Sequence, residues 1–407
     1  MDQIFVPRSE GEVAEAVRWA LAGRHALAIS GAGTKFGWGR PVNAVASLKL
    51  AQFSDIELYE PEELVLSARA GTSMSEIERR LAQHGQQLAF EPPDFGPLFG
   101  TPAGGGTLGG AVACNLAGPR RIHAGAARDH VLGFAGVNGL GESFKAGGRV
   151  VKNVTGFDLS KLVSGSFGTL AVMTHITLKV LPAPEESRTI LLLGCAAAAA
   201  IGAMAAALGS PHEISGAAFL PAALATKSRI VSIAGAGVSV TALRIEGAGP
   251  SVAVRAETLR TLLGVRGAIG ELTDVESRVL WREIRDVAPF LNDRARAIWQ
   301  LSVPPANGAQ VAGDVARQVD GECYFDWGGG RIWLSTVSET IETAAVIRAA
   351  VAAVGGHATL MRAGDAARRS VAAFQPLSGA EKHLVARLKD NFDPHRIFNP
   401  GRMYEGV

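Results

Sequence analysis

The sequence predicts an α+β fold in which short strands and helices form separate sheet-and-helix layers. Short apolar segments of strand length alternate with amphipathic segments of helix length along most of the chain. The chain has 407 residues, of which 47% are hydrophobic, so it is long enough to bury two or three cores. Residues 181–187 (LPAPEES) contain two prolines and two acidic residues and mark the strongest candidate domain boundary.

The N-terminal part alternates between helix and strand. Ser9 is an N-cap residue with a glutamate three positions later, which predicts an amphipathic helix over 9–23. The apolar segment 25–30 (HALAIS) predicts a buried strand, and 64–90 predicts a strand, a capped helix and a second strand. Residues 92–128 are rich in glycine and proline and are expected to be mostly loop.

The rest of the chain alternates in the same way. The predicted elements are strands over 131–139, 141–148 and 168–182 with a short helix over 157–165, strand–helix pairs over 239–264 and 331–355, and a helix with an ordered tail over 380–404. Residues 190–208 carry no charge and have about the length that spans a bilayer. Most of them are Ala and Gly, which contribute little transfer free energy. We therefore expect a strand followed by an alanine-rich packed helix, and no transmembrane segment.

Charge, cysteine and histidine content exclude several classes of protein. The 40 basic and 38 acidic residues nearly balance, so no general attraction to nucleic acid is expected. The three cysteines form no Cys-x-x-Cys pair, and the nine histidines never occur as His-x-His or His-x-x-x-His. These spacings disfavour an iron–sulfur cluster and a local metal site. The N-terminal segment MDQIFVPRSEGEV lacks the apolar region of a secretory signal, so we expect a cytoplasmic protein.

A glycine-rich segment, residues 30–39 (SGAGTKFGWG), directly follows the predicted strand at 25–30. A strand that leads into such a turn commonly brings backbone N–H groups close to a phosphate. A P-loop requires a glycine before its lysine, whereas Lys35 follows Thr34. A dinucleotide fingerprint requires a glycine where Phe36 stands. The segment is therefore expected to be a phosphate loop of another kind.

A second glycine cluster, residues 104–109 (GGGTLG), matches the dinucleotide spacing, and Asp129 lies 20 residues further on. That fingerprint must follow a strand, but the preceding EPPDFGPLFGTPA contains four prolines. The alternative is a second backbone cradle that faces the first loop across the same ligand, with glycines that allow a close approach of the chain.

Several segments, in the same order, resemble FAD-binding domains of the vanillyl-alcohol-oxidase or PCMH type. They are SGAGTK, GGGTLGGAVACNLAG, GAARDHVLGFAGVNGLGE, GGRVVKNVTGFDLSKLVSGSFGTLAVMTHITLKVLP and the terminal FDPHRIFNPGRM. Within this type the chain is most similar to the FAD-binding E subunits of bacterial glycolate oxidase (glycolate dehydrogenase). The resemblance implies a PCMH-type domain of two α+β subdomains over 1–183 and an α+β cap domain with an antiparallel sheet over 184–385. It also implies a C-terminal segment, 386–407, that returns to the flavin.

The resemblance also implies which residues bind FAD. The first loop is expected to supply donors to the pyrophosphate from Ser30, Gly31, Ala32, Gly33, Thr34 and Lys35. The second loop, along the ribityl and phosphate chain, includes Thr107, Gly109, Gly110 and Asn115. The segment at the adenosine end includes Gly165, Gly168, Thr169 and Val172, and Asn399 lies in the returning tail. Any one of these glycines alone is better explained as a tight turn, whereas the ordered set favours the cofactor.

Two departures from relatives limit what the resemblance implies. Relatives that attach flavin covalently in the first loop have a histidine where this chain has Thr34, so FAD is expected to be non-covalent. Relatives that oxidise 2-hydroxy acids on their own have a metal-binding His-x-x-Gly-Asp-Gly-Asn motif. Residues 355–365 (GGHATLMRAGD) have a histidine and an acid at the wrong spacing. No metal ligands are therefore assigned, and oxidation of substrate by this chain alone is disfavoured.

Oxidation of a 2-hydroxy acid by flavin requires a cation for the carboxylate and a base for the hydroxyl proton. Arg331 and Arg362 are candidate cations, and His357 and His130 are candidate bases. Each of the four also has a structural explanation, such as a hairpin cap for Arg331 or a strand residue for His357. Trp327 and Trp333 bracket three glycines and are expected to pack a hairpin.

Three functions follow. The first is the FAD-binding subunit of a glycolate dehydrogenase that oxidises glycolate to glyoxylate and passes electrons to an acceptor other than NAD. Its partners would be a second FAD-binding subunit and an iron–sulfur subunit, and the complex would lie at the inner face of the cell membrane. The second is a self-sufficient FAD-dependent oxidoreductase for a 2-hydroxy acid or a polyol. The third is a non-catalytic interaction subunit with a vestigial FAD site. The intact glycine loops argue against the third, and the missing metal motif argues against the second.

Overall fold

The computed structural model describes residues 3–148 and 157–407, and part of the fourth resembling segment, 149–156, lies outside this range. The chain divides into two compact units. The first unit comprises Met1–Ala117, Gly125–Ala183 and Pro376–Val407, and the second comprises Gly118–Ala124 and Pro184–Gln375.

Two of the expected boundaries differ from this division. An end of the middle domain at 385 would cut through α14 (Gly379–Phe392), and the first unit instead resumes at Pro376. Ser378 begins this helix with a capping box, so residues on both sides of 385 belong to one helix. The second difference is the short segment Gly118–Ala124, which belongs to the second unit although it follows the second glycine cluster.

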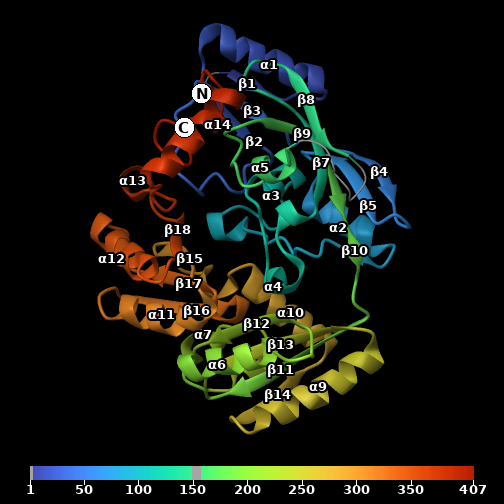
Figure 1. The fold of residues 1–407 in the computed structure, drawn as a ribbon, viewed down its shortest axis with the longest axis vertical. Helices are drawn as coiled ribbons and strands as arrows, with labels where there is room; N and C mark the ends of the chain where they lie inside the picture. Colours follow the sequence, from blue (N-terminus) through green and yellow to red (C-terminus); the bar gives the residue numbers. More distant parts are fainter. Residues whose placement is uncertain (1–2, 149–156) are drawn as a thin grey trace. The chain divides into compact units, whose positions relative to one another are not determined.

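The first unit contains both chain termini and two main sheets (Figure 1). Its strands are β1 (Gln3–Phe5), β2 (Leu27–Ser30), β3 (Ala46–Lys49), β4 (Ile56–Glu60), β5 (Val65–Arg69), β6 (Gln86–Gln87), β7 (Val131–Val137), β8 (Ser143–Gly147), β9 (Val172–Lys179) and β10 (Leu181–Pro182). Its α-helices are α1 (Glu10–Gly23), α2 (Met74–Ala82), α3 (Leu108–Ala113), α5 (Leu159–Val163) and α14, with single 3-10 turns at Pro97–Phe99 and Ala127–Asp129.

The smaller sheet is parallel, with strand order β1-β3-β2, and α1 packs on it. The predicted helix at 9–23 is confirmed, since the Ser9 hydroxyl accepts a hydrogen bond from the Glu12 N–H at 3.2 Å. Val13 and Val17 of the helix lie in one buried cluster with Leu27 of β2. The apolar stripe of α1 thus fixes the strand that leads into the first glycine loop.

The larger sheet is antiparallel, with strand order β4-β5-β9-β7-β8. The predicted strands at 131–139, 141–148 and 168–182 are confirmed as β7, β8 and β9 with the short β10. The expectation of loop over 92–128 missed α3, which contains two glycines in six residues. Glycine disfavours helix intrinsically, so tertiary packing of Leu108 and Val112 into the core of this sheet stabilises α3.

The C-terminal tail pairs with the strand of the first glycine loop. Leu27 N–H donates to the Ile397 carbonyl at 2.7 Å, and Asn399 N–H donates to the Leu27 carbonyl at 3.0 Å. At the base of the tail, Lys389 and Asp393 form an ion pair of 2.8 Å in which both side chains are fully buried. The Lys389 ammonium also donates to the carbonyls of Thr169 and Phe398, so it joins the helix, the tail and the rest of the unit.

The second unit is built on one antiparallel sheet with strand order β14-β11-β13-β12-β16-β17-β15-β18. Its strands are β11 (Glu186–Leu193), β12 (Ile214–Leu220), β13 (Val240–Gly247), β14 (Ala268–Leu272), β15 (Ala297–Ser302), β16 (Gly321–Asp326), β17 (Arg331–Thr336) and β18 (His357–Arg362). Its α-helices are α4 (Arg121–Ala124), α6 (Ala197–Leu208), α7 (Ala222–Ala225), α8 (Val231–Ala234), α9 (Gly249–Gly264), α10 (Asp274–Arg285), α11 (Gly308–Ala316), α12 (Ile341–Ala352) and α13 (Asp365–Ser370), with 3-10 turns at Ala288–Phe290, Pro305–Asn307 and Trp327–Gly329.

Helices α6, α9, α11 and α12 share one buried apolar cluster with one face of this sheet. Helix α10 packs on the other face, where the Trp281 indole donates to Thr189 Oγ1 at 2.8 Å. The segment 190–208 forms the end of β11 and then α6, as predicted. Among the described residues, no helix is long and apolar enough to cross a bilayer.

Candidate cofactor site

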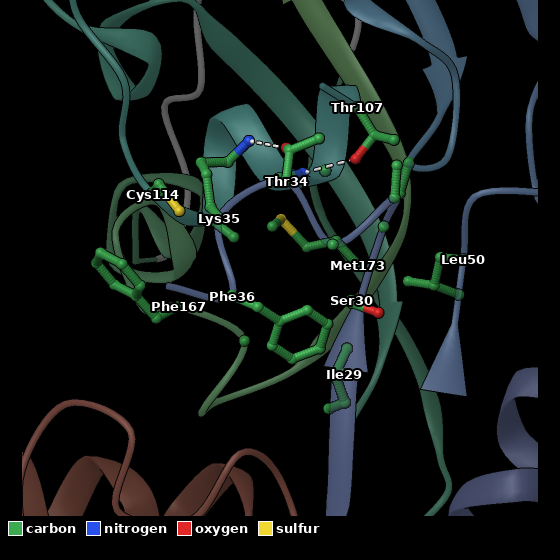
Figure 2. Close-up of a pocket in the computed structure, with 18 of the residues that line it drawn as sticks. Ile29, Ser30, Thr34, Lys35, Phe36, Leu50, Thr107, Cys114, Phe167 and Met173 are labelled. Atoms are coloured by element: carbon green, nitrogen blue, oxygen red, sulfur yellow. Dashed lines mark hydrogen bonds between the residues drawn. The ribbon is translucent and has the colours of Figure 1, made fainter. Parts of the chain in front are cut away.

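The two glycine loops of the first unit line one pocket that is open to solvent (Figure 2). The residues that line it are Ile29, Ser30, Gly31, Ala32, Gly33, Thr34, Lys35, Phe36, Leu50, Ala70, Thr107, Gly109, Gly110, Ala113, Cys114, Phe167, Gly168, Ala171, Met173 and Arg402. The pocket therefore brings together the whole predicted first loop and most of the predicted second loop.

The first loop begins where β2 ends and approaches the second loop closely at Gly31. A Cβ atom on Gly31 would lie 2.1 Å from Thr107 Oγ1, so only glycine fits here without separating the loops. Gly33 has φ +77°, a conformation that favours glycine. Glycine at these two positions thus allows the loop to make its turn and to lie close to Thr107.

The second loop is fixed against the sheet by backbone contacts. Gly109 N–H donates to the Ala70 carbonyl at 2.8 Å, and a Cβ on Gly109 would lie 2.9 Å from Ala70 Cβ. The Thr107 hydroxyl accepts a hydrogen bond from the Gly110 N–H at 3.3 Å. Two backbone cradles on either side of one pocket correspond to the alternative interpretation of residues 104–109, and the preceding segment forms no strand there.

Two cationic side chains give the pocket a positive charge. Lys35 is 9% exposed, and its ammonium donates to Thr34 Oγ1 at 3.3 Å. Burial lowers the pKa of Lys35, which Cys114 and Asp94 partly offset and Arg402 reinforces. Arg402, 7% exposed, donates to the Lys35 carbonyl at 3.0 Å. A buried ammonium in a pocket is stabilised by an anionic ligand.

Some predicted cofactor residues lie outside the pocket lining. They are Asn115, Gly165, Thr169, Val172 and Asn399. Asn115 accepts a hydrogen bond from the Arg128 N–H, and Val172 packs in the core beside α1. The Thr169 hydroxyl donates to the Ser166 carbonyl at 2.7 Å. The contacts of Asn115, Thr169 and Val172 are therefore with other parts of the first unit.

Asn399 joins three parts of the first unit behind the pocket. Its side chain is fully buried, with Oδ1 accepting from the Ile29 N–H at 2.8 Å and Nδ2 donating to the Phe167 carbonyl at 2.9 Å. A Cβ on Gly168 would lie 2.9 Å from Asn399 Nδ2, so the glycine makes room for the amide. The tail thus positions β2 relative to the Phe167–Gly168 turn.

The sequence interpretation missed several lining residues. Phe36, Cys114, Met173 and Arg402 are among them. The guanidinium of Arg402 lies 5.7 Å from the ring centres of both Phe36 and Phe167. Arg402 lies three residues after Asn399, in FNPGR. A tail that returns to the pocket at Asn399 also brings Arg402 there, so this spacing could have predicted Arg402 as a lining residue.

The donor set fits FAD. A dinucleotide requires backbone N–H groups and cations for its pyrophosphate and an apolar wall for its rings. The polar groups come from the first loop, which includes Lys35, and from Thr107. The apolar surface comes from Leu50, Phe167 and Met173. These residues would hold the cofactor in the first unit.

The structure separates the four catalytic candidates. Arg331 in β17 and His357 in β18 both lie opposite Ser302 of β15, the strand between theirs in the second unit. Arg362 lies at the other end of β18, where its guanidinium donates to the Asp293 carbonyl at 2.6 Å and to further loop carbonyls. His130 is 1% exposed in the first unit and packs against Phe90. These contacts favour a structural role for Arg362 and His130 over a catalytic one.

No group of three or more His, Cys, Asp or Glu side chains is positioned to hold a metal ion in the ranges 3–148 and 157–407. The cysteines Cys114, Cys195 and Cys323 are free thiols. Burial raises the pKa of the Cys323 thiol to about 11.

Comparison with solved structures shows the class of fold. The chain matches alkyldihydroxyacetonephosphate synthase with a TM-score of 0.70 and 19% identity, over 98% of this chain and 76% of the other. It matches 4-ethylphenol oxidase from Gulosibacter chungangensis with a TM-score of 0.71 and 15% identity, over 99% and 89% of the two chains. Residues 1–147 match a family described as an FAD binding domain. The fold and the family match together define a PCMH-type FAD-binding domain, which confirms the predicted α+β class and the FAD cofactor.

Sequence comparison identifies the family. The chain is 35% identical to glycolate oxidase subunit GlcE of Escherichia coli K12 over 96% of both sequences. The chain therefore belongs to the family of GlcE-type glycolate oxidase subunits. Partial relatives include glycolate oxidase subunit GlcD of Bacillus subtilis, 28% identical over 47% of this chain and 39% of that one. A D-lactate dehydrogenase of Anaerostipes hadrus is 31% identical over 45% of this chain and 37% of that one.

Proposed function

We propose that this chain is the FAD-carrying subunit of a multi-subunit glycolate dehydrogenase that oxidises glycolate to glyoxylate and passes electrons to an acceptor other than NAD. The observation that supports this most is the similarity to a glycolate oxidase subunit over nearly the whole of both chains, together with intact glycine loops. The GlcD similarity, by contrast, is confined to about half of this chain.

The chain's own residues bind and orient the cofactor. Bound FAD supplies a two-electron acceptor for oxidation of the substrate C–H bond. The backbone of Gly31–Thr34 and the Lys35 ammonium bind the anionic part, and Met173 and Phe167 exclude water from the pocket wall. Asn399 and Arg402 orient the loop from behind through their bonds to Ile29 and Lys35.

We further propose that two kinds of partner complete the enzyme: a second FAD-binding glycolate oxidase subunit and an iron–sulfur subunit. The sequence has three cysteines without a Cys-x-x-Cys pair and lacks the His-x-x-Gly-Asp-Gly-Asn motif. An iron–sulfur cluster needs four ligands, so electron transfer beyond the flavin is assigned to another chain.

FAD is expected to be released when the purified chain is denatured with acid. The first loop has Thr34, whose hydroxyl accepts from the Lys35 ammonium, where covalent relatives have a linking histidine. The measurement is the flavin absorbance of the supernatant and of the pellet after acid precipitation. Yellow, flavin-containing protein in the washed pellet would show a covalent bond and contradict the assignment.

The complex, rather than the isolated chain, is expected to oxidise glycolate. A tagged chain expressed in its own cell should co-purify with a second flavoprotein and an iron–sulfur protein, and this preparation should reduce a dye with glycolate. The chain purified alone, with FAD bound, should show at most a small fraction of that turnover. Efficient glycolate-to-dye electron transfer by the isolated chain would reject the proposed division of labour in favour of a self-sufficient enzyme.

A further inference from the structure

A row of polar side chains crosses the sheet of the second unit. Arg331 in β17 pairs with Ser302 in β15, which pairs on its other side with His357 in β18. Asp326 in β16 is opposite Arg331. Directly opposed residues in antiparallel strands project from the same face, with Cβ atoms about 4.5–5.5 Å apart. These four residues, each from a different strand, therefore lie side by side on one face.

The β16–β17 hairpin fixes the arginine of this row. The Arg331 guanidinium lies 3.4 Å from the centre of the Trp327 indole, at the tip of the hairpin. Asp326 is fully buried, and its Oδ1 accepts from the Trp327 N–H at 2.8 Å. Burial lowers the pKa of Arg331 to about 9, with Asp326 opposing this effect, so the guanidinium remains charged at neutral pH.

A second guanidinium reaches the same indole from the segment Gly118–Ala124, hereafter the arm. The Trp327 indole donates to the Gly118 carbonyl at 3.0 Å, and the Arg121 guanidinium lies 4.8 Å from the ring centre. Arg121 is exposed, whereas Arg331 is 5% exposed. Two cations thus contact one aromatic ring, and Asp326 lies opposite Arg331 in the neighbouring strand.

A buried ion pair fixes the arm beside the sheet. Arg120 donates to both carboxylate oxygens of Glu246 at 2.9 Å, and Arg244 lies 3.4 Å from the same group. Burial alone would raise the pKa of Glu246, but the charges of Arg244 and Arg120 lower it well below its usual range. The side chains of Arg120 and Glu246 are about one-tenth exposed. A planar bidentate pair of this kind fixes orientation, so the next residue, Arg121, has a defined position.

We propose that Arg121 and Arg331, with Ser302 and His357, form a carboxylate-binding subsite for a small 2-hydroxy acid. Arginine pairs with a carboxylate through two parallel hydrogen bonds, and Ser302 and His357 offer polar partners for the adjacent hydroxyl group. Two guanidinium groups at the same indole favour an anion over a neutral molecule of the same shape. The identity of this acid as glycolate rests on the proposed function, whereas the subsite itself does not.

The pKa of His357 supports the same arrangement. Partial burial and the nearby Arg121 charge lower it from its ordinary value. The imidazole is therefore mainly neutral at pH 7 and has one ring nitrogen available as an acceptor. A neutral acceptor beside two cations suits a ligand that has both a carboxylate and a hydroxyl group.

The first test uses the purified complex and measures steady-state glycolate oxidation. Arg121→Gln removes the exposed cation but keeps a polar side chain, and we expect KM for glycolate to rise about tenfold or more, with a smaller change in kcat. Arg121→Lys should restore part of the affinity. Arg317→Gln, an exposed arginine of the same unit with an ion pair to Asp314, is the matched control and should leave KM unchanged.

The second test uses the full FAD-loaded chain and calorimetric titration with glycolate and its neutral analogue glycolamide. We expect binding of glycolate, much weaker binding of glycolamide, and loss of glycolate binding in Arg121→Gln with FAD content and circular dichroism unchanged. Equal binding of both compounds, or an unchanged KM in Arg121→Gln, would overturn the subsite. If the complex does not oxidise glycolate but the chain still binds carboxylates through Arg121, the proposed function fails and the subsite stands.

Discussion

Gly31→Ala is expected to weaken FAD binding to the purified chain while leaving the protein folded. The new Cβ would lie 2.1 Å from Thr107 Oγ1 and 3.1 Å from Thr107 Cβ, so the two loops must separate. Overpacking of this kind typically costs about 1–3 kcal/mol. Because the loops bind the cofactor together, we expect FAD affinity to fall by about tenfold to a hundredfold.

The measurement is the ratio of flavin to protein after gel filtration, with an FAD titration of the apoprotein by fluorescence quenching. Gly313→Ala is the matched control, because it adds the same methyl group to a helix of the second unit where no atom lies within 4 Å. Gly109→Ala should resemble Gly31→Ala, since its Cβ would lie 2.9 Å from Ala70 Cβ. Full FAD occupancy in both loop variants would refute the two-loop site.

Lys389→Met is expected to destabilise the first unit by about 3–5 kcal/mol, the usual cost of removing one partner from a buried ion pair. Asp393 is fully buried and would lose the cation that it pairs with. The Thr169 and Phe398 carbonyls would also lose a donor. Because Phe398 precedes Asn399, the tail should loosen from β2, and FAD affinity should fall with stability.

Urea unfolding, followed by release of flavin fluorescence, measures this effect. Lys382→Met is the control, since it makes the same substitution on an exposed turn of the same helix, α14. A Lys389→Met protein with the unfolding midpoint of Lys382→Met would show that the buried pair contributes nothing to holding the tail.

Local sequence signals predicted the first glycine loop well. The strand before it, the glycines and Lys35 lie within ten residues of one another, so their spacing alone restricts the backbone. The same kind of signal predicted the Ser9 cap of α1 and the strand–helix pairs of the second unit. Helix α3 was not predicted, because its stability comes from packing rather than from intrinsic helix propensity.

Long-range contacts could not be predicted from spacing. Arg402 reaches the carbonyl of Lys35 across most of the chain, and only the path of the tail brings them together. Arg331, Ser302 and His357 share a face because the strand order is β17-β15-β18, which differs from the sequence order. Arg121 was assigned to a loop of the first domain, whereas the Arg120–Glu246 pair holds it on the second unit.

The flavin content and the activity of complexes assembled with wild-type and Gly31→Ala chains test the central claim most directly. Both chains should co-purify with the same partners, because the substitution lies in the first-unit pocket. The account predicts that the Gly31→Ala complex contains less FAD, by up to one per copy of this chain, and loses glycolate-to-dye activity in the same proportion. Full activity in a complex that lacks this FAD would contradict the account, because the flavin of this chain would then be dispensable for glycolate oxidation.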